Sequence, residues 1–284
     1  MLDKLRKFLT HPGFQAAPIT VLGRGLALVG LLARGRPPRF ALFPGGPLVE
    51  VPADRRYTTV ANYLMRDQVE PELAALQRFL GPGDVLVDVG ANIGLFSLKG
   101  GHLVGEAGLV LAVEPGATSL SRLSDNLALN NLPMVRIVRA ALSDHEGEMA
   151  LFHIPLGDDP QAFSLIPGGG QVPSEMVRVT TLDTLVQTHG LTRLDCVKID
   201  VEGAEPMVLA GGRATLERFH PIVIFEVNAP LAEATGDSSA AANTLIAMGY
   251  RLHALRGEIL EPLQTVPQHH CNLVAVHPQG RQPG

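Results

Sequence analysis

Residues 84–94 read Asp84-Val-Leu-Val-Asp88-Val-Gly90-Ala-Asn92-Ile-Gly94, and this stretch decides the fold. Its apolar start is typical of a buried parallel strand that helices cover on both faces. At Asp88 the strand gives way to a turn with two glycines, whose missing Cβ atoms permit unusual backbone conformations and close approaches. Residues 95–99 can then start a helix. A strand, a glycine turn and a helix in this order are typical of a nucleotide-type cofactor site at the open end of a sheet.

Strands and helices alternate outward from this turn. The hydrophobic pattern predicts seven strands, at 84–89, 109–114, 135–139, 194–199, 222–227, 250–255 and 272–277. It predicts helices at 94–103, 117–130, 205–218 and 238–248, and a lead-in helix that begins at Asp67 and ends before Gly81. The alternation predicts an α/β fold, with a mostly parallel, seven-stranded Rossmann-like sheet that has helices on both faces.

The chain is predicted to have three parts: an N-terminal arm and lead-in at 1–68, the Rossmann-like domain at 69–278, and a frayed tail at 279–284. Within the arm, residues 34–52 are rich in proline, glycine and arginine, which is typical of a linker or an irregular lead-in. An insertion at 145–181 contains β-prone runs at 148–153 and 176–181. Insertions of this kind commonly cover the ligand crevice, and a solvent-exposed hairpin is the alternative.

Charge is distributed unevenly along the chain. Residues 1–39 hold seven basic side chains and one acid, Asp3, which leaves 16 basic and 27 acidic residues in the remainder. The basic arm can touch an anionic membrane as a peripheral contact, or it is a solvated tail. Its apolar run Ile19–Ala33 is short for a transmembrane helix, is interrupted by Arg24 and lacks a secretory cleavage pattern. The acidic body argues against a nucleic-acid partner, and we expect a cytoplasmic protein. The oligomeric state is left open.

The strand ends indicate which cofactor the turn accepts. A dinucleotide-binding turn has glycine where this chain has Asn92, and a carboxylate at Asp88 repels a pyrophosphate but suits an ammonium group. Glu114, at the end of the second strand, is placed to accept hydrogen bonds from both ribose hydroxyls. Residues after the third strand are placed to meet the edge of an adenine: Ala141, Ser143 and Asp144. A cofactor with adenosine at one end and an amino acid at the other is S-adenosylmethionine.

Several motifs follow the turn in a fixed order: Glu114-Pro115, Asn126 and Asn130, residues 141–144, Thr181-Leu-Asp183, and Lys198-Ile-Asp200-Val-Glu202-Gly-Ala-Glu205. Together with the turn, they resemble the FkbM family of S-adenosylmethionine-dependent methyltransferases over roughly residues 69–277. The resemblance implies a class I Rossmann-like methyltransferase that methylates a hydroxyl of a sugar, polyketide or related natural product. The acceptor is then a small molecule or a glycan.

The expected cofactor-binding residues are Glu70, Asp88, Gly90, Asn92, Gly94, Glu114, Ala141, Ser143 and Asp144. Of these, Glu70 rests on the resemblance, which implies that it folds over the cofactor. Two alternatives stay open at this point. One is an NAD-dependent oxidoreductase, which the missing middle glycine disfavours. The other is a non-catalytic Rossmann-fold scaffold that binds a partner or a membrane.

The block at 198–205 supplies candidate catalytic residues. Asp200 ends a buried strand, so its carboxylate emerges beside the glycine turn. Methyl transfer to a hydroxyl requires loss of a proton, for which Asp200 is the first candidate base and Glu202 the second. Glu205 and Glu226 are candidate substrate-lining residues, although Glu205 can instead stabilise the start of a helix.

Several other side chains have more than one interpretation. Lys198 either neutralises the acidic cluster or extends outward, and Tyr57 and Tyr63 either line the acceptor site or lie on the surface.

The carboxylates can hold a divalent cation such as Mg²⁺, with Asp200 and Glu226 converging from two strand ends, but no sequence feature supports the ion. The run His269-His270-Cys271 lacks zinc spacing and reads as loop histidines. Cys196, in an apolar strand, is predicted to be a buried free thiol.

Overall fold

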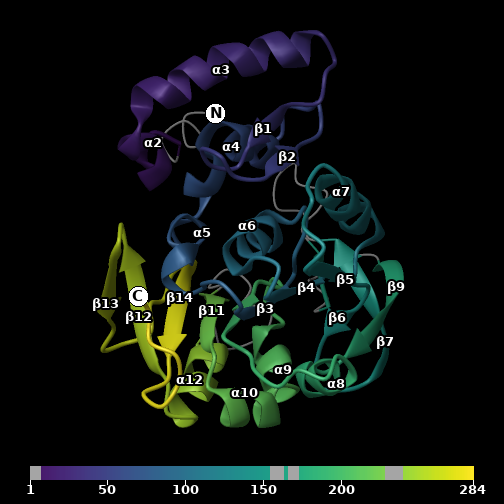
Figure 1. Cartoon of the computed structure of the whole chain (residues 1–284), viewed down its shortest axis with the longest axis vertical. Helices are drawn as coiled ribbons and strands as arrows, with labels where there is room; N and C mark the ends of the chain where they lie inside the picture. Colours follow the sequence, from purple (N-terminus) through teal and green to yellow (C-terminus); the bar gives the residue numbers. More distant parts are fainter. Residues whose placement is uncertain (1–7, 154–162, 166–172, 228–238) are drawn as a thin grey trace.

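The structure is a computed structural model that describes residues 8–153, 163–165, 173–227 and 239–284. Its centre is an eight-stranded sheet with the order β13-β12-β14-β11-β10-β3-β4-β5 (Figure 1). Its strands are β3 (Val85–Val89), β4 (Leu109–Val113), β5 (Val135–Val138), β10 (Cys196–Ile199), β11 (Ile222–Val227), β12 (Arg251–Arg256), β13 (Ile259–Pro262) and β14 (Cys271–Val276). Strands β5, β4, β3, β10 and β11 are parallel, and β14 runs antiparallel between β11 and β12.

All seven predicted strands are present, but the predicted strand count was one too low. The additional strand, β13, pairs antiparallel with β12 at the edge of the sheet. Its residues are exposed or half-buried, so it has no buried face and leaves no apolar alternation in the sequence. An edge strand of this kind is invisible to hydrophobic periodicity.

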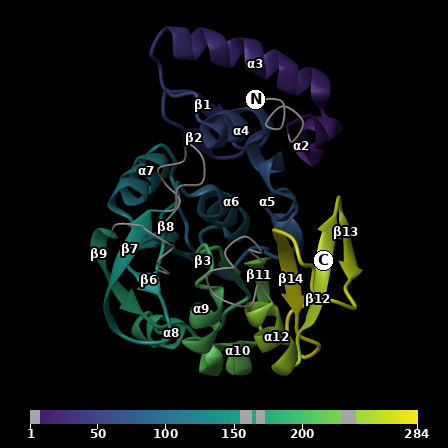
Figure 2. The same ribbon diagram turned by 180° about the vertical axis from the view of Figure 1, so that it is seen from behind.

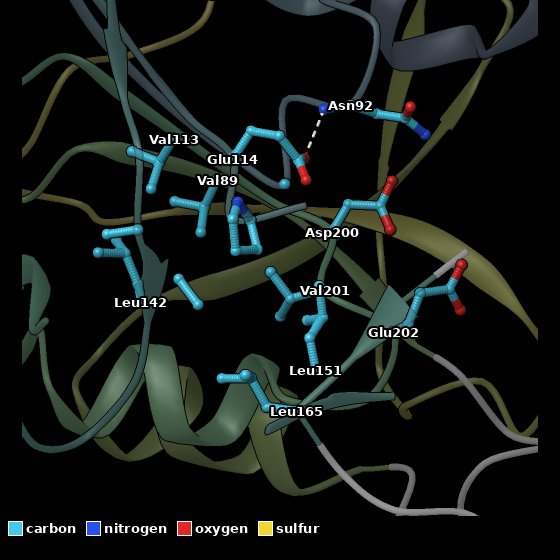
Figure 3. A pocket seen from close by; sticks show the side chains of 14 residues that line it. Val89, Asn92, Val113, Glu114, Leu142, Leu151, Leu165, Asp200, Val201 and Glu202 are labelled. Carbon is cyan, nitrogen blue, oxygen red and sulfur yellow. Dashed lines mark hydrogen bonds between the residues drawn. The ribbon is translucent and has the colours of Figure 1, made fainter. Parts of the chain in front are cut away.

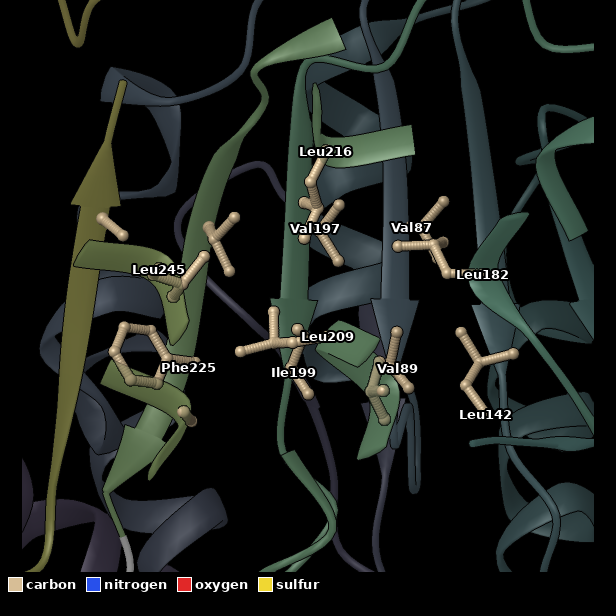
Figure 4. Packing of buried hydrophobic residues seen from close by; sticks show 14 of the residues in the cluster. Val87, Val89, Leu142, Leu182, Val197, Ile199, Leu209, Leu216, Phe225 and Leu245 are labelled. Atoms are coloured by element: carbon tan, nitrogen blue, oxygen red, sulfur yellow. The ribbon is translucent and has the colours of Figure 1, made fainter. Parts of the chain in front are cut away.

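Helices cover both faces of the sheet. One face packs against α8 (Leu182–Thr188), α9 (Glu205–Ala210), α10 (Arg213–Phe219) and α12 (Ala240–Ala247). Figure 4 shows this packing, with Val87, Ile199 and Phe225 of the strands against Leu209 and Leu245 of the helices. The other face packs against α6 (Leu95–Val104), α7 (Ala117–Ala128) and the lead-in segment. Cys196 is fully buried in this second core as a free thiol, as predicted.

Two predicted helices are broken. The lead-in helix is three short pieces, η1 (Arg66–Val69), α5 (Pro71–Ala74) and η2 (Leu76–Arg78), because Glu70 precedes a proline and takes an extended conformation. The helix at 205–218 divides into α9 and α10 at Gly211, where a Cβ atom would lie 2.0 Å from the Ser143 carbonyl oxygen. By contrast α8 was missed, although the side chain of Thr181 caps its first turn by accepting from the Thr184 N–H.

The insertion and the short strand before it form a second sheet with the order β6-β9-β7-β8. Its strands are β6 (Ala141–Leu142), β7 (Gly147–His153), β8 (Phe163–Ser164) and β9 (Pro173–Thr180). Figure 2 shows this small sheet at one side of the molecule, next to α7, and Figure 1 shows it beside β5 of the main sheet. The two β-prone runs of the sequence therefore correspond to β7 and β9, which pair with each other.

The N-terminal arm is ordered where the structure describes it. It consists of α2 (Pro12–Ala16), α3 (Pro18–Ala33), β1 (Arg39–Ala41), β2 (Leu48–Glu50) and α4 (Tyr57–Met65). The prediction that 34–52 is a linker was wrong, because β1 and β2 pair as an antiparallel hairpin. No helix of the described residues is long and apolar enough to cross a membrane.

Asn126 of α7 and Asn130, just after that helix, hold this hairpin to the body. Asn130 accepts from the Leu48 N–H and donates to the Leu48 carbonyl oxygen, both at 2.8 Å. Asn126 accepts from the Glu50 N–H and donates to the carbonyl oxygen of Ile93, in the glycine turn. Asn126 thus links the arm directly to the turn.

The tail at 279–284 is not frayed, contrary to the prediction. The Gly284 N–H donates to the Arg78 carbonyl oxygen, and Arg281 forms an ion pair with the buried Asp84. These contacts join the end of the chain to the start of β3.

The glycine turn is fixed by one close approach. Gly90 has a positive φ of 77°, and a Cβ atom there would lie 1.9 Å from the carbonyl oxygen of Asp200. Only glycine therefore lets the end of β3 and the end of β10 meet.

We expect Gly90→Ala to destabilise the protein by about 3 kcal/mol, because backbone strain and a backbone clash act together. Gly83→Ala is the matched control: its φ is 81°, but a Cβ atom there meets open space. Gly83→Ala should lower the free energy of unfolding by only about 1 kcal/mol. Urea unfolding of both variants measures this, and equal losses would contradict the role given to the Gly90–Asp200 approach.

Candidate active site

Two cavities meet at the glycine turn, above the carboxyl ends of β3, β4 and β10. They share three lining residues, Gly90, Asn92 and Asp200. The first cavity is also lined by Val89, Val113, Glu114, Pro115, Ala140, Ala141, Leu142, Leu151, Leu165, Val201 and Glu202. The second is also lined by Val51, Pro52, Tyr57, Thr58, Thr59, Ala61, Asn62, Val69, Glu70, Ala91, Ile93, Leu95, Phe96 and Lys198. The turn therefore separates one elongated site into two halves.

Glu114 is the principal polar group of the first cavity. Its carboxylate accepts from the Asn92 N–H at 2.9 Å, drawn as a dashed line in Figure 3, and from the Gly116 N–H at 2.8 Å. Burial raises the pKa of Glu114 to about 7, against the opposing effect of these two hydrogen bonds. Each carboxylate oxygen still has capacity for a second donor. The Glu114 carboxylate is thus oriented by the backbone of the turn itself.

Apolar side chains form the other walls of the first cavity. Figure 3 shows Val113, Leu142 and Leu151 on one side and the carboxylates of Asp200 and Glu202 on the other. Leu151 and Leu165 come from the insertion, which therefore contributes to the crevice. The β-prone run indicated a strand around Leu151, but no feature of the sequence indicated Leu165.

Of the residues predicted after the third strand, only Ala141 lines this cavity. Ser143 is fully buried and donates to the Asp144 carboxylate at 3.2 Å. Asp144 is exposed and lies 2.7 Å from His145, whose hydrogen bond lowers the pKa of Asp144. Both lie outside the two cavities as the described residues form them.

Asp88 lies beneath the turn. It is 1% exposed, and one carboxylate oxygen accepts from the Ser97 hydroxyl at 2.6 Å. The other, Oδ1, is buried with no hydrogen-bond partner among the described residues. Burial raises the pKa of Asp88, while nearby Lys198 opposes the rise.

Lys198 supplies positive charge between these acids. The register of β3 and β10 pairs it with Asp88, and its Nζ lies 2.9 Å from the Asp200 carboxylate and 4.9 Å from the centre of the Phe96 ring. Burial alone would lower the pKa of Lys198, but the acids around it raise the value above its ordinary range. Of the two sequence interpretations, the structure favours neutralisation of the cluster.

The second cavity brings the arm and the body together. On the body side, Glu70 accepts from the Asn272 side chain at 3.2 Å, and burial raises the pKa of Glu70 to about 7. On the arm side, α4 contributes Tyr57, Thr58 and Asn62. Tyr63, the other predicted aromatic, lies outside this cavity and packs edge-on against Phe40 with ring centres 5.5 Å apart. No feature of the sequence indicated Thr58 or Asn62 as lining residues.

Three carboxylates gather where β10 and β11 end. Oxygen atoms of Asp200, Glu202 and Glu226 lie within 4.8 Å of one another. Burial and the repulsion of these neighbours raise the pKa of Glu226, and His270 lies 3.4 Å from its carboxylate. Oxygen ligands of this kind suit Mg²⁺. A proton held by Glu226 relieves the same repulsion without a cation.

Two predicted site residues hold the backbone near the cavities but do not line them. Glu205, at the start of α9, is buried and accepts from the Val201 N–H at 3.0 Å. Gly94 is the N-cap of α6 and packs against Leu123. These contacts fix the corner after β10 and the start of the helix after the turn.

The strand order, the acid Glu114 directly after β4 and the glycine turn are the features of a class I Rossmann-like methyltransferase domain. Residues 88–252 match the model of the FkbM methyltransferase domain. The chain belongs to this family. Membership in this methyltransferase family contradicts the alternative that the chain is an NAD-dependent oxidoreductase.

Curated relatives with sequence similarity carry methyltransferase names. The chain is 33% identical over 156 residues to methyltransferase sdnD of Sordaria araneosa, covering 44% of this chain and 59% of that protein. It is 31% identical over 159 residues to 31-O-demethyl-FK506 methyltransferase FkbM of Streptomyces tacrolimicus, covering 46% and 60%. For 2-O-methyltransferase NoeI of Sinorhizobium fredii the identity is 28%, with 48% and 60% covered. The chain thus spans about three fifths of the length of these relatives.

Among solved structures, methyltransferase FkbM from Methylobacillus flagellatus KT aligns with a TM-score of 0.43 at 15% identity. The alignment covers 89% of this chain and 59% of that one.

The buried carboxyl of Glu205 makes the stability of the protein depend on pH. Burial raises its folded-state pKa to about 7 from an ordinary value of 4.5. The folded state therefore binds more protons between these values, so the free energy of unfolding falls as pH rises through this window. The glutamine in Glu205→Gln cannot ionise. Between about pH 5 and about pH 8, we therefore expect the free energy of unfolding of this variant to fall by about 2 kcal/mol less than that of the wild type.

Urea unfolding at both pH values measures this difference. Glu106→Gln, at an exposed position, is the control and should keep the wild-type pH dependence. An unchanged pH dependence in Glu205→Gln would refute the assignment of a buried, proton-binding carboxyl to this position.

Proposed function

We propose that this protein transfers the methyl group of S-adenosylmethionine to a hydroxyl oxygen of a sugar, polyketide or related natural product. The observation that carries the proposal is the glycine turn between the two cavities, with Glu114 on one side and the Lys198–Glu70 group on the other. Family membership supports methyl transfer. The printed names of two relatives, an O-methyltransferase acting at position 31 and a 2-O-methyltransferase, support oxygen as the acceptor atom.

The chemistry of the lining residues fits the cofactor. In the first cavity, Glu114 is suited to accept from the two ribose hydroxyls, and the apolar walls suit the faces of an adenine ring. In the second, Lys198 is suited to pair with the α-carboxylate and Glu70 with the ammonium group. Asp88, with its unpartnered carboxylate oxygen, offers further negative charge beneath the turn.

The carboxylates beside the turn supply the proton chemistry. In the proposed reaction the acceptor oxygen bonds to the methyl carbon, the carbon–sulfur bond breaks, and S-adenosylhomocysteine leaves as the second product. The hydroxyl proton passes to a carboxylate, with Asp200 as the base and Glu202 as the next candidate. Asp200 lines both cavities, so it lies where a group approaching from either side meets it. No step of this scheme requires a divalent cation.

We expect Glu114→Gln to weaken binding of S-adenosylhomocysteine by about 10- to 100-fold, because a charged acceptor for two hydroxyls is lost. Isothermal titration calorimetry measures the affinity, with Glu106→Gln as the control that keeps the wild-type value. Unchanged affinity in Glu114→Gln would contradict the placement of the ribose. Stronger thermal stabilisation by NADH than by S-adenosylhomocysteine would contradict the choice of cofactor.

We expect Asp200→Asn to lower the turnover number by about a hundredfold or more, because the amide cannot take the hydroxyl proton. Its affinity for S-adenosylhomocysteine should stay within about tenfold of wild type, since the amide oxygen still accepts from Lys198. The assay follows labelled methyl transfer to a panel of hydroxylated sugars and polyketide alcohols. Asp125→Asn, an exposed change on α7, is the control. Wild-type turnover in Asp200→Asn would exclude this residue as the base.

A further inference from the structure

The outer face of α3 carries a stripe of exposed apolar side chains. Among the described residues, four of the ten large apolar side chains that are exposed lie on this one helix. They are Ile19 at 86% exposed, Leu22 at 60%, Leu26 at 81% and Val29 at 67%. Their spacing of three, four and three residues places them on one side of the helix.

The opposite side of α3 is fastened to the body. Val21 and Leu28 are buried there, and the Arg24 side chain donates to the Leu64 carbonyl oxygen of α4 at 2.6 Å. Figure 1 shows α3 lying along the outer edge of the molecule, away from the main sheet. The apolar stripe is therefore presented outward by a helix that is held in place from behind.

The charge around the stripe has one sign. No acidic residue occurs between Asp3 and Glu50, whereas Arg34 and Arg36 are exposed directly after the helix. Glu50 itself is neutralised by an ion pair with Arg39 at 3.0 Å. The rest of the chain, by contrast, has an excess of acids.

This charge pattern indicates which kind of partner fits the exposed face of α3. A second copy of the same face would add arginines and no acid to pair with them, because no acidic residue occurs between Asp3 and Glu50. An anionic bilayer surface complements both features, since its headgroups attract the arginines and its acyl region takes the apolar stripe. We propose that the outer face of α3 binds an anionic membrane surface, with the helix lying in the plane of the interface.

This binding is a peripheral one and goes beyond the proposed methyl transfer. The 16 residues of α3 lie along the interface and do not span it. Helix α3 packs on α4, and α4 lines the second cavity. Docking therefore places that cavity one helix away from the bilayer surface.

The test is cosedimentation of the full chain with vesicles. Wild-type protein should pellet with vesicles of phosphatidylcholine and phosphatidylserine, less with phosphatidylcholine alone, and less as salt rises, because headgroup attraction is screened. The double variant Leu22→Gln, Leu26→Gln should bind the anionic vesicles about tenfold more weakly or worse, since two apolar anchors are lost. Both positions are exposed, so thermal unfolding and affinity for S-adenosylhomocysteine should match wild type.

Two further variants separate the contributions. Ile259→Gln removes an exposed apolar side chain from β13, on a different element, and should leave vesicle binding unchanged. Arg34→Glu with Arg36→Glu should abolish the preference for anionic vesicles. The proposal is overturned if wild-type protein fails to bind anionic vesicles, or if Leu22→Gln, Leu26→Gln binds them as wild type does. It is also overturned if sedimentation velocity shows a dimer that this double variant dissociates, because α3 then binds a second copy.

Discussion

The contact between Gly90 and the carbonyl oxygen of Asp200 is the constraint on which the site depends. It lets two neighbouring parallel strands end at the same point, so the turn after β3 and the carboxylates after β10 face a common space. The same turn donates its Asn92 N–H to Glu114 of the next strand. These contacts hold three strand ends together, and the two cavities lie on either side of this junction. A side chain at position 90 would separate all of these groups at once.

Around this contact the main energetic problem is negative charge. Burial raises the pKa values of Asp88, Glu70, Glu114, Glu205 and Glu226, and Lys198 is the cation that lies among them in the described part of the site. The site therefore carries more acid than its lysine neutralises. An environment of this kind attracts a cationic ligand and favours a carboxylate able to take a proton, which are the two requirements of the proposed methyl transfer.

Much of the sheet could be predicted because burial imposes a pattern. Four of the five parallel strands, β3, β4, β10 and β11, are buried along almost their whole length, so they read as apolar runs. Asp88, Glu114, Asp200 and Glu226 each mark where one of these runs ends. The errors occur where no such pattern exists. Strand β13 has no buried face. The lead-in is interrupted before a proline, and the helix after β10 is interrupted at Gly211, where the backbone approaches the Ser143 carbonyl oxygen more closely than a side chain would allow. The hairpin of β1 and β2 was missed because its partner contacts come from Asn126 and Asn130, far away in the chain.

The sequence by itself determined the type of fold and the positions of Glu114, the glycine turn and the acidic block, since each depends on residues adjacent along one strand or turn. The tertiary structure decided which of these residues reach a cavity. It left Asp88 beneath the turn, directed Glu205 to the Val201 N–H, and turned Ser143 and Asp144 toward each other. It also brought Leu151 and Leu165 of the insertion and Thr58 and Asn62 of the arm to the site. These placements depend on the packing of segments distant in sequence, and no local periodicity records such packing.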